Sequence, residues 1–271
     1  MSLIVKICGL STRETLEVAL DAGADMVGFV FFPPSPRHLS LETARDLGEF
    51  VKGRAVKVAL TVDADDATLG GIVEALQPDI LQLHGHESVA RLGHIRQKFS
   101  LPVMKAIAVE TASDLASLPE YAEVADRILF DARAPREATR PGGLGTVFDW
   151  RILQNLELGI PYMVSGGLRA DNVTEAIRVT RAGGVDVSSG VERSPGHKDG
   201  EMIRAFIKAA RATDLASPLP VHGRRSDRSR DPGEGGSRHS RVTEDLQEEP
   251  LTPILSPQAR GEGVETTRRR R

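Results

Sequence analysis

Apolar residues along the chain gather in short runs that alternate with longer segments of helical periodicity. About eight runs are rich in Val, Ile, Leu and Phe and have the length of strands, at residues 3–8, 25–31, 56–62, 80–83, 103–107, 127–131, 162–165 and 185–188. Between them, apolar positions recur with a helical period, which predicts helices over residues 12–22, 41–51, 65–76, 88–98, 171–178 and 200–210. The segments after the fifth and sixth runs show no clear period. The pattern therefore predicts strands and helices in alternation.

The predicted strands are apolar along almost their whole length, which indicates burial on both faces. Parallel strands covered by crossover helices have this property. Such an alternation forms either a doubly wound open sheet or a closed barrel. The strand count near eight favours the barrel, and the first strand–helix loop, Cys8-Gly9-Leu10-Ser11, lacks the G-x-G-x-x-G pattern of a dinucleotide-binding open sheet. We therefore predict an α/β fold of the (β/α)8 TIM-barrel class.

The composition of the chain changes near Asp214. From there to the last residue the sequence has no Phe, Tyr or Trp and is dense in Arg, Ser, Pro, Gly and Glu. Such a segment buries too little apolar surface to offset the entropy lost on ordering. We therefore predict two parts, a barrel domain over residues 1–212 and a disordered low-complexity tail over residues 213–271.

Charge and cysteine content narrow the partners and the compartment. The formal net charge of the 271-residue chain is −3, which gives no reason to expect nucleic-acid or membrane binding. No apolar run approaches the roughly 18 residues of a membrane span, and the first residues show no leader pattern. A single cysteine excludes an intrachain disulfide and fits a reducing compartment. We expect a cytoplasmic protein that binds a small molecule, as a monomer or weak homodimer.

Reactive side chains close two of the apolar runs. Cys8 ends the first run and Asp131 ends the sixth. In a TIM barrel the C-terminal ends of all strands meet in one mouth, where the reacting groups lie. A lone cysteine is more often a small buried hydrophobe, but its occurrence together with Asp131 favours a catalytic pair. His84 ends the fourth run and either points into the mouth or makes a hydrogen bond at its rim, and we include it among the substrate-binding candidates.

Clusters of glycine and serine close the seventh and eighth runs. The loops after these two strands are the usual phosphate site of the barrel, and glycines let backbone N–H groups come close to an anion. Glycines also form ordinary tight turns, but their occurrence at both strand ends favours a phosphate site. The predicted phosphate ligands are Gly166, Gly167, Ser188, Ser189 and Gly190.

The loop at residues 32–38 contains three prolines and ends in Arg37-His38. Because prolines restrict the loop, Arg37 could present a pre-organised fork to a carboxylate. On composition alone, a solvated surface arginine is the commoner case. The seven histidines include His84 and His86 in one loop, yet no set of histidines and carboxylates has a metal-ligand spacing. We predict no metal and no cofactor.

Several motifs, in order along residues 3–210, resemble those of the phosphoribosylanthranilate isomerases of tryptophan biosynthesis. The most specific are Lys6-Ile7-Cys8-Gly9-Leu10 and Val185-Asp186-Val187-Ser188-Ser189-Gly190-Val191-Glu192. The others are Gly28-Phe29-Val30-Phe31, Ser35-Pro36-Arg37, Gln82-Leu83-His84-Gly85, Leu129-Phe130-Asp131, Phe148-Asp149-Trp150 and Ser165-Gly166-Gly167-Leu168. The resemblance implies a TIM barrel of the ribulose-phosphate-binding type.

The resemblance also implies an activity and roles for the candidate residues. The activity is an Amadori rearrangement that converts N-(5-phosphoribosyl)anthranilate into 1-(2-carboxyphenylamino)-1-deoxyribulose 5-phosphate. By analogy with the family, Asp131 is the general acid that opens the ribose ring, and Cys8 is the general base that removes the C2 proton. Arg37 would bind the anthranilate carboxylate, and the two clusters of glycine and serine would hold the phosphate.

The sequence departs from the family pattern at some positions, and other functions stay open at this point. Leu144 stands where the family commonly has Thr, which predicts altered affinity rather than lost activity. A related sugar-phosphate isomerase of the histidine pathway would carry an aspartate in place of Cys8, and a pentose-phosphate epimerase would carry metal-ligand histidines. A non-catalytic barrel that binds a phosphate ligand is the alternative outside enzymes, and the presence of Cys8 and Asp131 argues against it.

Overall fold

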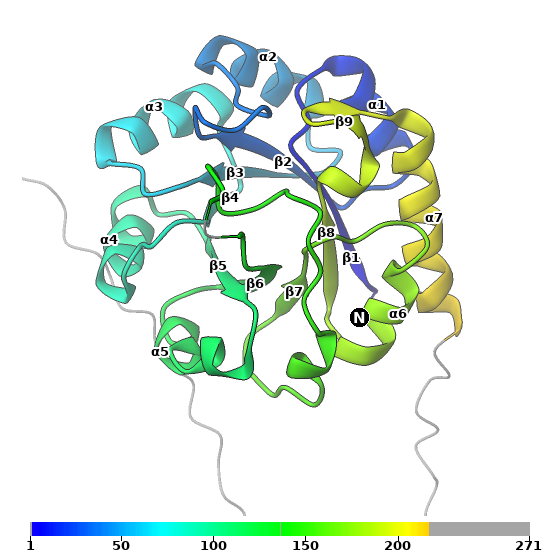
Figure 1. The fold of residues 1–271 in the computed structure, drawn as a ribbon. Coiled ribbons are helices and arrows are strands. Elements are labelled where there is room, and N and C mark those ends of the chain that lie inside the picture. Colours follow the sequence, from blue (N-terminus) through cyan, green and yellow to red (C-terminus); the bar gives the residue numbers. More distant parts are fainter. Residues whose placement is uncertain (1, 136, 217–271) are drawn as a thin grey trace, which may run out of the picture. The chain divides into compact units, whose positions relative to one another are not determined.

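Eight parallel strands close into a barrel in the computed structural model, which describes residues 2–135 and 137–216 (Figure 1). Each strand pairs with its neighbours in sequence, and β1 (Ile4–Cys8) closes the barrel by pairing with β8 (Gly184–Val187). The strands between them are β2 (Met26–Phe31), β3 (Val56–Thr61), β4 (Ile80–Leu83), β5 (Val103–Val109), β6 (Arg127–Ala132) and β7 (Tyr162–Val164). The predicted TIM barrel is confirmed, and the predicted strand ends lie within two residues of the observed ones.

Helices outside the ring of strands connect most of the strands (Figure 1). They are α1 (Arg13–Asp21), α2 (Leu41–Val51), α3 (Asp66–Leu76), α4 (Val89–Phe99), α5 (Leu118–Ala122), α6 (Val173–Thr180) and α7 (Gly200–Ala216). Helix α7 continues past its predicted end at residue 210 and past the predicted domain boundary at residue 212. The rest of the predicted tail, from residue 217 onward, lies outside the described residues.

The two segments without a clear helical period form little regular helix. Strand β5 is followed by a 3₁₀ turn, η1 (Ala112–Leu115), and by the short α5. Strand β6 is followed by an irregular segment that ends in a second 3₁₀ turn, η2 (Trp150–Leu153). Pro135, Pro141 and three glycines oppose helix formation in that segment. It crosses in front of the barrel instead of packing as a helix on its outside (Figure 1).

Polar residues at the helix starts explain where four helices begin. The side chains at these positions each accept a hydrogen bond from the backbone N–H three residues later, and they are Thr12, Ser40, Asp65 and Ser88. Such a cap satisfies one of the N–H groups that a helix leaves unpaired in its first turn. The caps fix the ends of the loops that follow β1, β2, β3 and β4, and these loops surround the barrel mouth.

The inside of the barrel changes from apolar to polar toward the C-terminal ends of the strands. Every second side chain of a strand points inward. One apolar cluster consists of Met26, Val58, Met104, Ala106, Leu129 and Met163. Two residues beyond Leu129, the next inward position of β6 carries Asp131, and on β1 the inward positions after Ile4 carry Lys6 and Cys8. The strand period therefore brings both predicted catalytic residues to the mouth.

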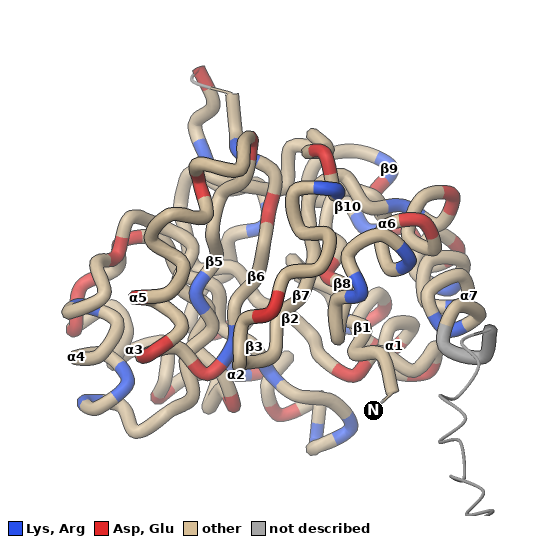
Figure 2. The backbone as a smooth tube through the Cα atoms, turned by 90° about the horizontal axis from the view of Figure 1, so that it is seen from below, with Lys and Arg blue, Asp and Glu red and all other residues tan. Residues whose placement is uncertain are grey.

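Acidic and basic residues are interspersed along the helices and loops (Figure 2). Neither sign of charge dominates one side of the barrel in this view, in keeping with the small net charge of the chain. Among the described residues, no helix is long and apolar enough to cross a membrane. Polar side chains with reactive groups are concentrated at the barrel mouth.

Candidate active site

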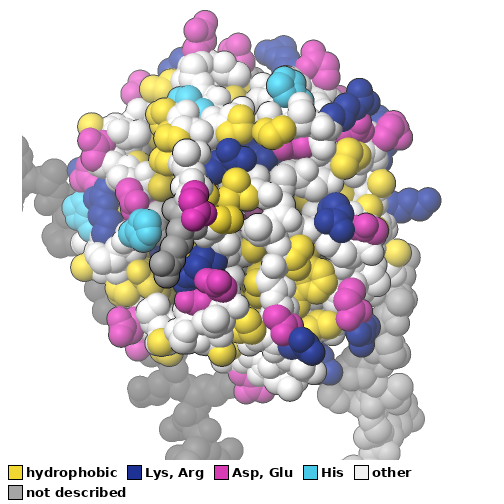
Figure 3. Space-filling view, viewed as in Figure 1, with side chains coloured by type: hydrophobic (Ala, Val, Ile, Leu, Met, Phe, Trp, Pro, Cys, Tyr) yellow, Lys and Arg dark blue, Asp and Glu magenta, His cyan; other side chains and the backbone are white. Residues whose placement is uncertain are grey.

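A cavity opens at the C-terminal ends of the strands. Its wall contains all nine residues that the sequence predicts for the site, namely Cys8, Arg37, His84, Asp131, Gly166, Gly167, Ser188, Ser189 and Gly190. In the space-filling view along the barrel, apolar, basic and acidic side chains surround the centre (Figure 3). The fold thus brings together residues at the C-terminal ends of six different strands, or in the loops after them.

Cys8 lies on the cavity wall beside a buried ion pair. Lys6 and Asp186 are opposite each other on β1 and β8, and 2.8 Å separates Lys6 Nζ from Asp186 Oδ1. Gly28 on β2 makes room for the thiol and the ammonium group, because a Cβ there would lie 2.8 Å from Cys8 Sγ and 3.1 Å from Lys6 Nζ. The thiol is therefore next to a cation inside the barrel.

Burial and charge act in opposite directions on the Cys8 thiol. Burial raises its pKa, and the charge of Lys6 lowers it, with smaller effects from Asp186, which raises it, and Lys198, which lowers it. The resulting pKa lies above the usual value for a thiol. For Lys6, burial lowers the pKa, but Asp186 and Cys8 outweigh burial and the pKa is raised, so the ammonium group stays charged. The thiol is protonated at neutral pH, and Lys6 favours its ionisation.

Asp131 lies in the cavity wall at the end of β6 and contacts His84. Asp131 Oδ2 is 3.2 Å from His84 Nε2, and Asp131 Oδ1 accepts a hydrogen bond from the Ala132 N–H at 2.9 Å. The other ring nitrogen, Nδ1, is 3.2 Å from Gln82 Nε2. With the Gln82 amide nitrogen facing Nδ1, the tautomer that fits has Nδ1 as the acceptor and the proton on Nε2, directed at Asp131. His84 therefore points into the mouth, and it orients the Asp131 carboxyl group.

The segment after β6 lies across the cavity and approaches Asp131 closely. Residues 140–146 all line the cavity, and Gly143 O accepts a hydrogen bond from Arg37 Nη2 at 3.1 Å. A Cβ on Gly142 would be 2.5 Å from Asp131 Oδ2 and 3.1 Å from His84 Nε2. Position 142 therefore accepts only glycine without displacement of its neighbours.

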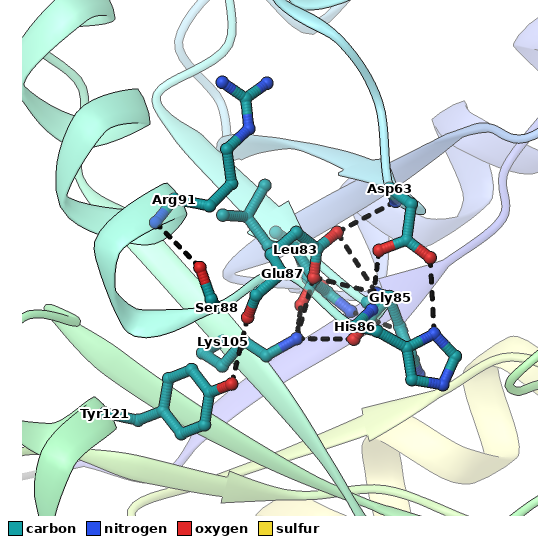
Figure 4. Close-up of polar contacts among 11 residues, drawn as sticks. Asp63, Leu83, Gly85, His86, Glu87, Ser88, Arg91, Lys105 and Tyr121 are labelled. Carbon is teal, nitrogen blue, oxygen red and sulfur yellow. Dashed lines mark hydrogen bonds and ion pairs between the residues drawn. The ribbon is translucent and has the colours of Figure 1, made fainter.

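A buried network holds the loop that carries His84. Lys105 on β5 donates to Gly85 O and to Glu87 Oε2, both at 2.7 Å. Glu87 Oε1 also accepts from the backbone N–H groups of Asp63 and Gly85, at 3.0 and 3.2 Å. Figure 4 shows Lys105 and Glu87 between the two loops, with Tyr121 below them. The pair ties the loops after β3 and β4 to β5.

Lys105→Met is expected to lower the free energy of unfolding by about 3–5 kcal/mol, because it leaves the buried Glu87 carboxylate without its cation. Denaturant unfolding of the wild type and of the variant measures the loss, with the same dependence of the unfolding free energy on denaturant concentration applied to both. Lys98→Met is the matched control, since the Lys98 ammonium pairs with Asp66 at an exposed position of α4. Similar losses in the two variants would contradict a special contribution of the buried pair.

Arg37 is almost fully buried and forms an ion pair with Glu192. Its Nε and Nη2 donate to the two carboxylate oxygens of Glu192, each at 2.7 Å, and Glu192 begins β9 (Glu192–Ser194). Lys198, on β10 (His197–Lys198), donates to Glu192 Oε1 at 2.8 Å. Burial raises the pKa of Glu192, but its contacts with Arg37 and Lys198 outweigh burial and hold the pKa below its usual value. In this structure Glu192 occupies the fork that the sequence analysis assigned to a carboxylate ligand.

Backbone N–H groups at the end of β7 are available for an anion. The N–H groups of Gly166 and Gly167 donate to no acceptor within the described part of the chain. The loop after β8 packs against the loop after β7 at Gly190, where a Cβ would collide with Leu168 O. Lys198 Nζ donates to Ser188 O at 2.9 Å in the second loop. Free N–H groups near a buried ammonium group suit a phosphate.

The cavity therefore offers acid–base chemistry and anion binding. It presents a thiol, a carboxyl group, an imidazole and backbone donors. Within residues 2–135 and 137–216, no group of three or more His, Cys, Asp or Glu side chains is placed to hold a metal ion.

Comparison with known proteins identifies the family of this chain. A family model described as N-(5'-phosphoribosyl)anthranilate isomerase matches residues 5–209. The chain belongs to this isomerase family. The N-(5'-phosphoribosyl)anthranilate isomerase of Bradyrhizobium diazoefficiens is 76% identical over 217 residues, which cover 80% of this chain and 97% of that protein. The enzyme of the same name from Nitrobacter hamburgensis is 71% identical over 215 residues, covering 79% of this chain and 96% of that protein.

Solved phosphoribosylanthranilate isomerases have the same barrel. The structure from Thermotoga maritima is 35% identical, with a TM-score of 0.71, and the match covers 78% of this chain and 99% of that one. A second solved isomerase is 33% identical, with a TM-score of 0.66 and the same coverage. That protein is in complex with reduced 1-(o-carboxyphenylamino)-1-deoxyribulose 5-phosphate.

Several charged residues lie in or beside the cavity of this family member although the sequence prediction did not include them in the site. Lys6 and Asp186 carry a sequence signal, because a charge at an inward position of an apolar strand demands a partner inside the barrel. Glu192 and Lys198 lie beyond β8, the last strand of the barrel, in a short hairpin that no apolar period marks. Arg140 belongs to an irregular segment, so its place on the cavity wall comes only from the structure.

Proposed function

We propose that this chain converts N-(5-phosphoribosyl)anthranilate into 1-(2-carboxyphenylamino)-1-deoxyribulose 5-phosphate, an Amadori rearrangement in tryptophan biosynthesis. The observation that carries the proposal is the presence of Cys8 and Asp131 in one cavity that also contains free backbone donors. An aldose-to-ketose conversion needs a proton donor at the ring oxygen and a base at C2. Family membership and the names of the relatives support the same intramolecular oxidoreductase activity.

Asp131 acts in the first step as the general acid. It donates its proton to the ring oxygen of the ribose, the bond from C1 to that oxygen breaks, and the lone pair of the anthranilate nitrogen forms the C=N bond of a Schiff base. The His84 and Ala132 contacts hold the carboxyl group in one orientation during the transfer. This restriction supplies the alignment that an acid–base step requires.

Cys8 acts in the second step as the general base. Its thiolate removes the C2 proton, the electron pair of that bond forms a C1–C2 double bond, and the C=N electron pair of the Schiff base returns to the nitrogen, which gives an enolamine. The enolamine then tautomerises to the ketose. The ammonium group of Lys6 stabilises the thiolate, since its charge lowers the pKa of Cys8 against the effect of burial.

The remaining predicted site residues bind the substrate in this proposal. The phosphate lies against backbone and hydroxyl donors at Gly166, Gly167, Ser188, Ser189 and Gly190, which all line the cavity. Arg37 faces the anthranilate end, where Nη1 is the one guanidinium nitrogen that has no hydrogen bond within the described residues. His84 contributes through its contact with Asp131.

The catalytic unit that we propose is the barrel, residues 1–212, with residues 213–271 taking no part in turnover. The family match ends at residue 209, and a match of 217 residues covers 97% of the Bradyrhizobium diazoefficiens enzyme. A cytoplasmic monomer or weak homodimer is the form we expect. One solved relative consists of monomers of the dimeric Thermotoga maritima enzyme, so both states occur among solved relatives.

The decay of fluorescence of freshly prepared N-(5-phosphoribosyl)anthranilate tests the proposed function. The full chain is expected to accelerate the decay well beyond spontaneous hydrolysis of the substrate, with a kcat of about 1–10³ s⁻¹. Chromatography identifies the ketose product. An inactive protein that still binds a phosphate ligand would support the non-catalytic barrel instead.

Gly142→Ala is expected to lower kcat/KM in this assay by about 10- to 100-fold while the barrel stays folded. The added methyl group displaces Asp131 or the segment above it, and misplacement of a reacting group by about 1 Å has an effect of this size. Gly70→Ala in α3 is the control, because a Cβ there meets nothing within 4 Å. If both variants kept wild-type activity, the close approach to Asp131 would have no catalytic importance.

A further inference from the structure

Arg37 has little hydrogen-bonding capacity left for a ligand. A guanidinium group has five N–H donors, one on Nε and two on each Nη. The Nε donor and one Nη2 donor go to Glu192, and Nη2 also donates to Gly143 O. Only Nη1 remains. Because a bidentate contact with a carboxylate uses two nitrogens, Arg37 alone cannot make one without giving up a bond that it holds here.

A second arginine lies on the wall of the same cavity. Arg140 precedes Pro141 and Gly142 in the segment that crosses the mouth, and all three line the cavity. Its Nε is shielded from solvent and donates to no partner within the described residues. A shielded guanidinium donor without an acceptor is costly. The site therefore contains an unused cationic donor group beside its opening.

The charges around Arg140 favour the binding of an anion. Arg37 and Lys198 share one carboxylate, that of Glu192, so two basic side chains face a single acidic one. Burial lowers the pKa of Arg140, the charge of Arg37 lowers it further, and Glu192 only partly offsets them. An anionic ligand group between Arg140 and Arg37 would remove this imbalance.

We propose that Arg140 binds the carboxylate of the anthranilate ring, together with Nη1 of Arg37. The inference rests on the proposed function and specifies how this chain recognises that substrate. The segment that carries Arg140 approaches Arg37 at Gly143, which accepts from Arg37 Nη2 and on which a Cβ would lie 2.5 Å from Arg37 Nη1. The charge of Arg37 also acts on Arg140. The phosphate has its own donors at Gly166 and Gly167 on the loop after β7. The carboxylate is the substrate anion that these donors leave unpaired.

Two ligands that differ only in the carboxylate test the role of Arg140. One is reduced 1-(o-carboxyphenylamino)-1-deoxyribulose 5-phosphate, and the other is the same compound without the carboxyl group. Their dissociation constants are measured by titration with the full-length wild type, Arg140→Met and Arg140→Lys. Arg151→Met is the matched control, because Arg151 is exposed, pairs with Asp149 and does not line the cavity.

The expected result is selective for the carboxylate. Arg140→Met should raise the dissociation constant of the carboxylated ligand about 10- to 100-fold, the usual effect of losing one charge-assisted hydrogen bond. The dissociation constant of the other ligand should change less than about twofold. Arg140→Lys should recover part of the loss, and Arg151→Met should match the wild type. In turnover, KM should rise with kcat within about threefold of wild type.

Three outcomes would overturn the assignment. An equal loss for both ligands would place Arg140 at the phosphate or in a purely structural role, and no loss for either would show that it makes no ligand contact. Both results leave the proposed function intact, provided that the wild type turns over the substrate. A wild type that neither turns over the substrate nor discriminates between the ligands would refute the proposed function itself, and with it the role of Arg140.

Discussion

Cys8→Ser is expected to lower kcat/KM by about 10²- to 10⁴-fold, the usual contribution of a general base. Serine fits the space of the thiol, so the barrel and the Lys6–Asp186 pair should persist. Its hydroxyl group does not ionise in the accessible pH range, and no base then acts on the C2 proton. The fluorescence decay measures the loss, and the reduced product analogue should still bind within about threefold of its wild-type affinity.

The pH dependence of the wild-type rate follows from the same residue. The base must be the thiolate, and burial raises the pKa of the Cys8 thiol above its usual value. Below that pKa the thiolate fraction increases about tenfold per pH unit. Wild-type kcat/KM should therefore rise from neutral pH into the alkaline range. It should level off only at a pH above the usual pKa of a thiol.

The serine variant separates this effect from other titrations. Its residual activity should lack the alkaline rise, because the group that titrates is absent. A wild-type kcat/KM that stays constant from about pH 7 to pH 9, or a Cys8→Ser variant with the same alkaline rise, would contradict the assignment of the base. Substrate binding measured across the same range excludes a pH effect on affinity alone.

The strand period accounts for how much of the site the sequence predicts. Cys8, His84 and Asp131 each lie at or just after the end of a strand, and parallel strands bring such residues together wherever they occur in the chain. The glycines after β7 and β8 follow the same logic. These placements depend only on where the strands lie and on the alternation of inward and outward side chains along them. Apolar runs in the sequence indicate both.

The partners of Arg37 and the position of Arg140 depend on other information. Glu192 is 155 residues away from Arg37 in sequence, in a hairpin that no apolar run marks. Arg140 follows β6 in a segment of Pro and Gly, whose course is set by close contacts such as that of Gly142 with Asp131. Such contacts arise from packing in three dimensions. The proline-rich loop therefore predicts an Arg37 fork that is free for a ligand, whereas the fold places Glu192 against it.

Asp131→Asn is expected to lower kcat by about 10²- to 10⁴-fold, because the amide cannot transfer a proton to the ring oxygen. Asparagine has the same shape, and its oxygen can still accept from His84 Nε2 or from the Ala132 N–H. Affinity for the reduced product analogue should therefore stay within about threefold of wild type. Single-turnover fluorescence decay measures the chemical step directly.

Asp149→Asn is the control for the loss of a carboxylate elsewhere, because Asp149 pairs with Arg151 at an exposed position. Its kcat should match that of the wild type. The double variant Cys8→Ser, Asp131→Asn gives a stricter test. Ring opening and C2 deprotonation are successive steps of one reaction, so an enzyme that has lost one of them has little left to lose from the other. The loss of activity in the double variant should therefore be much smaller than the product of the losses in the two single variants. A fully multiplicative loss would mean that the two residues act on independent processes, which contradicts a shared acid–base mechanism.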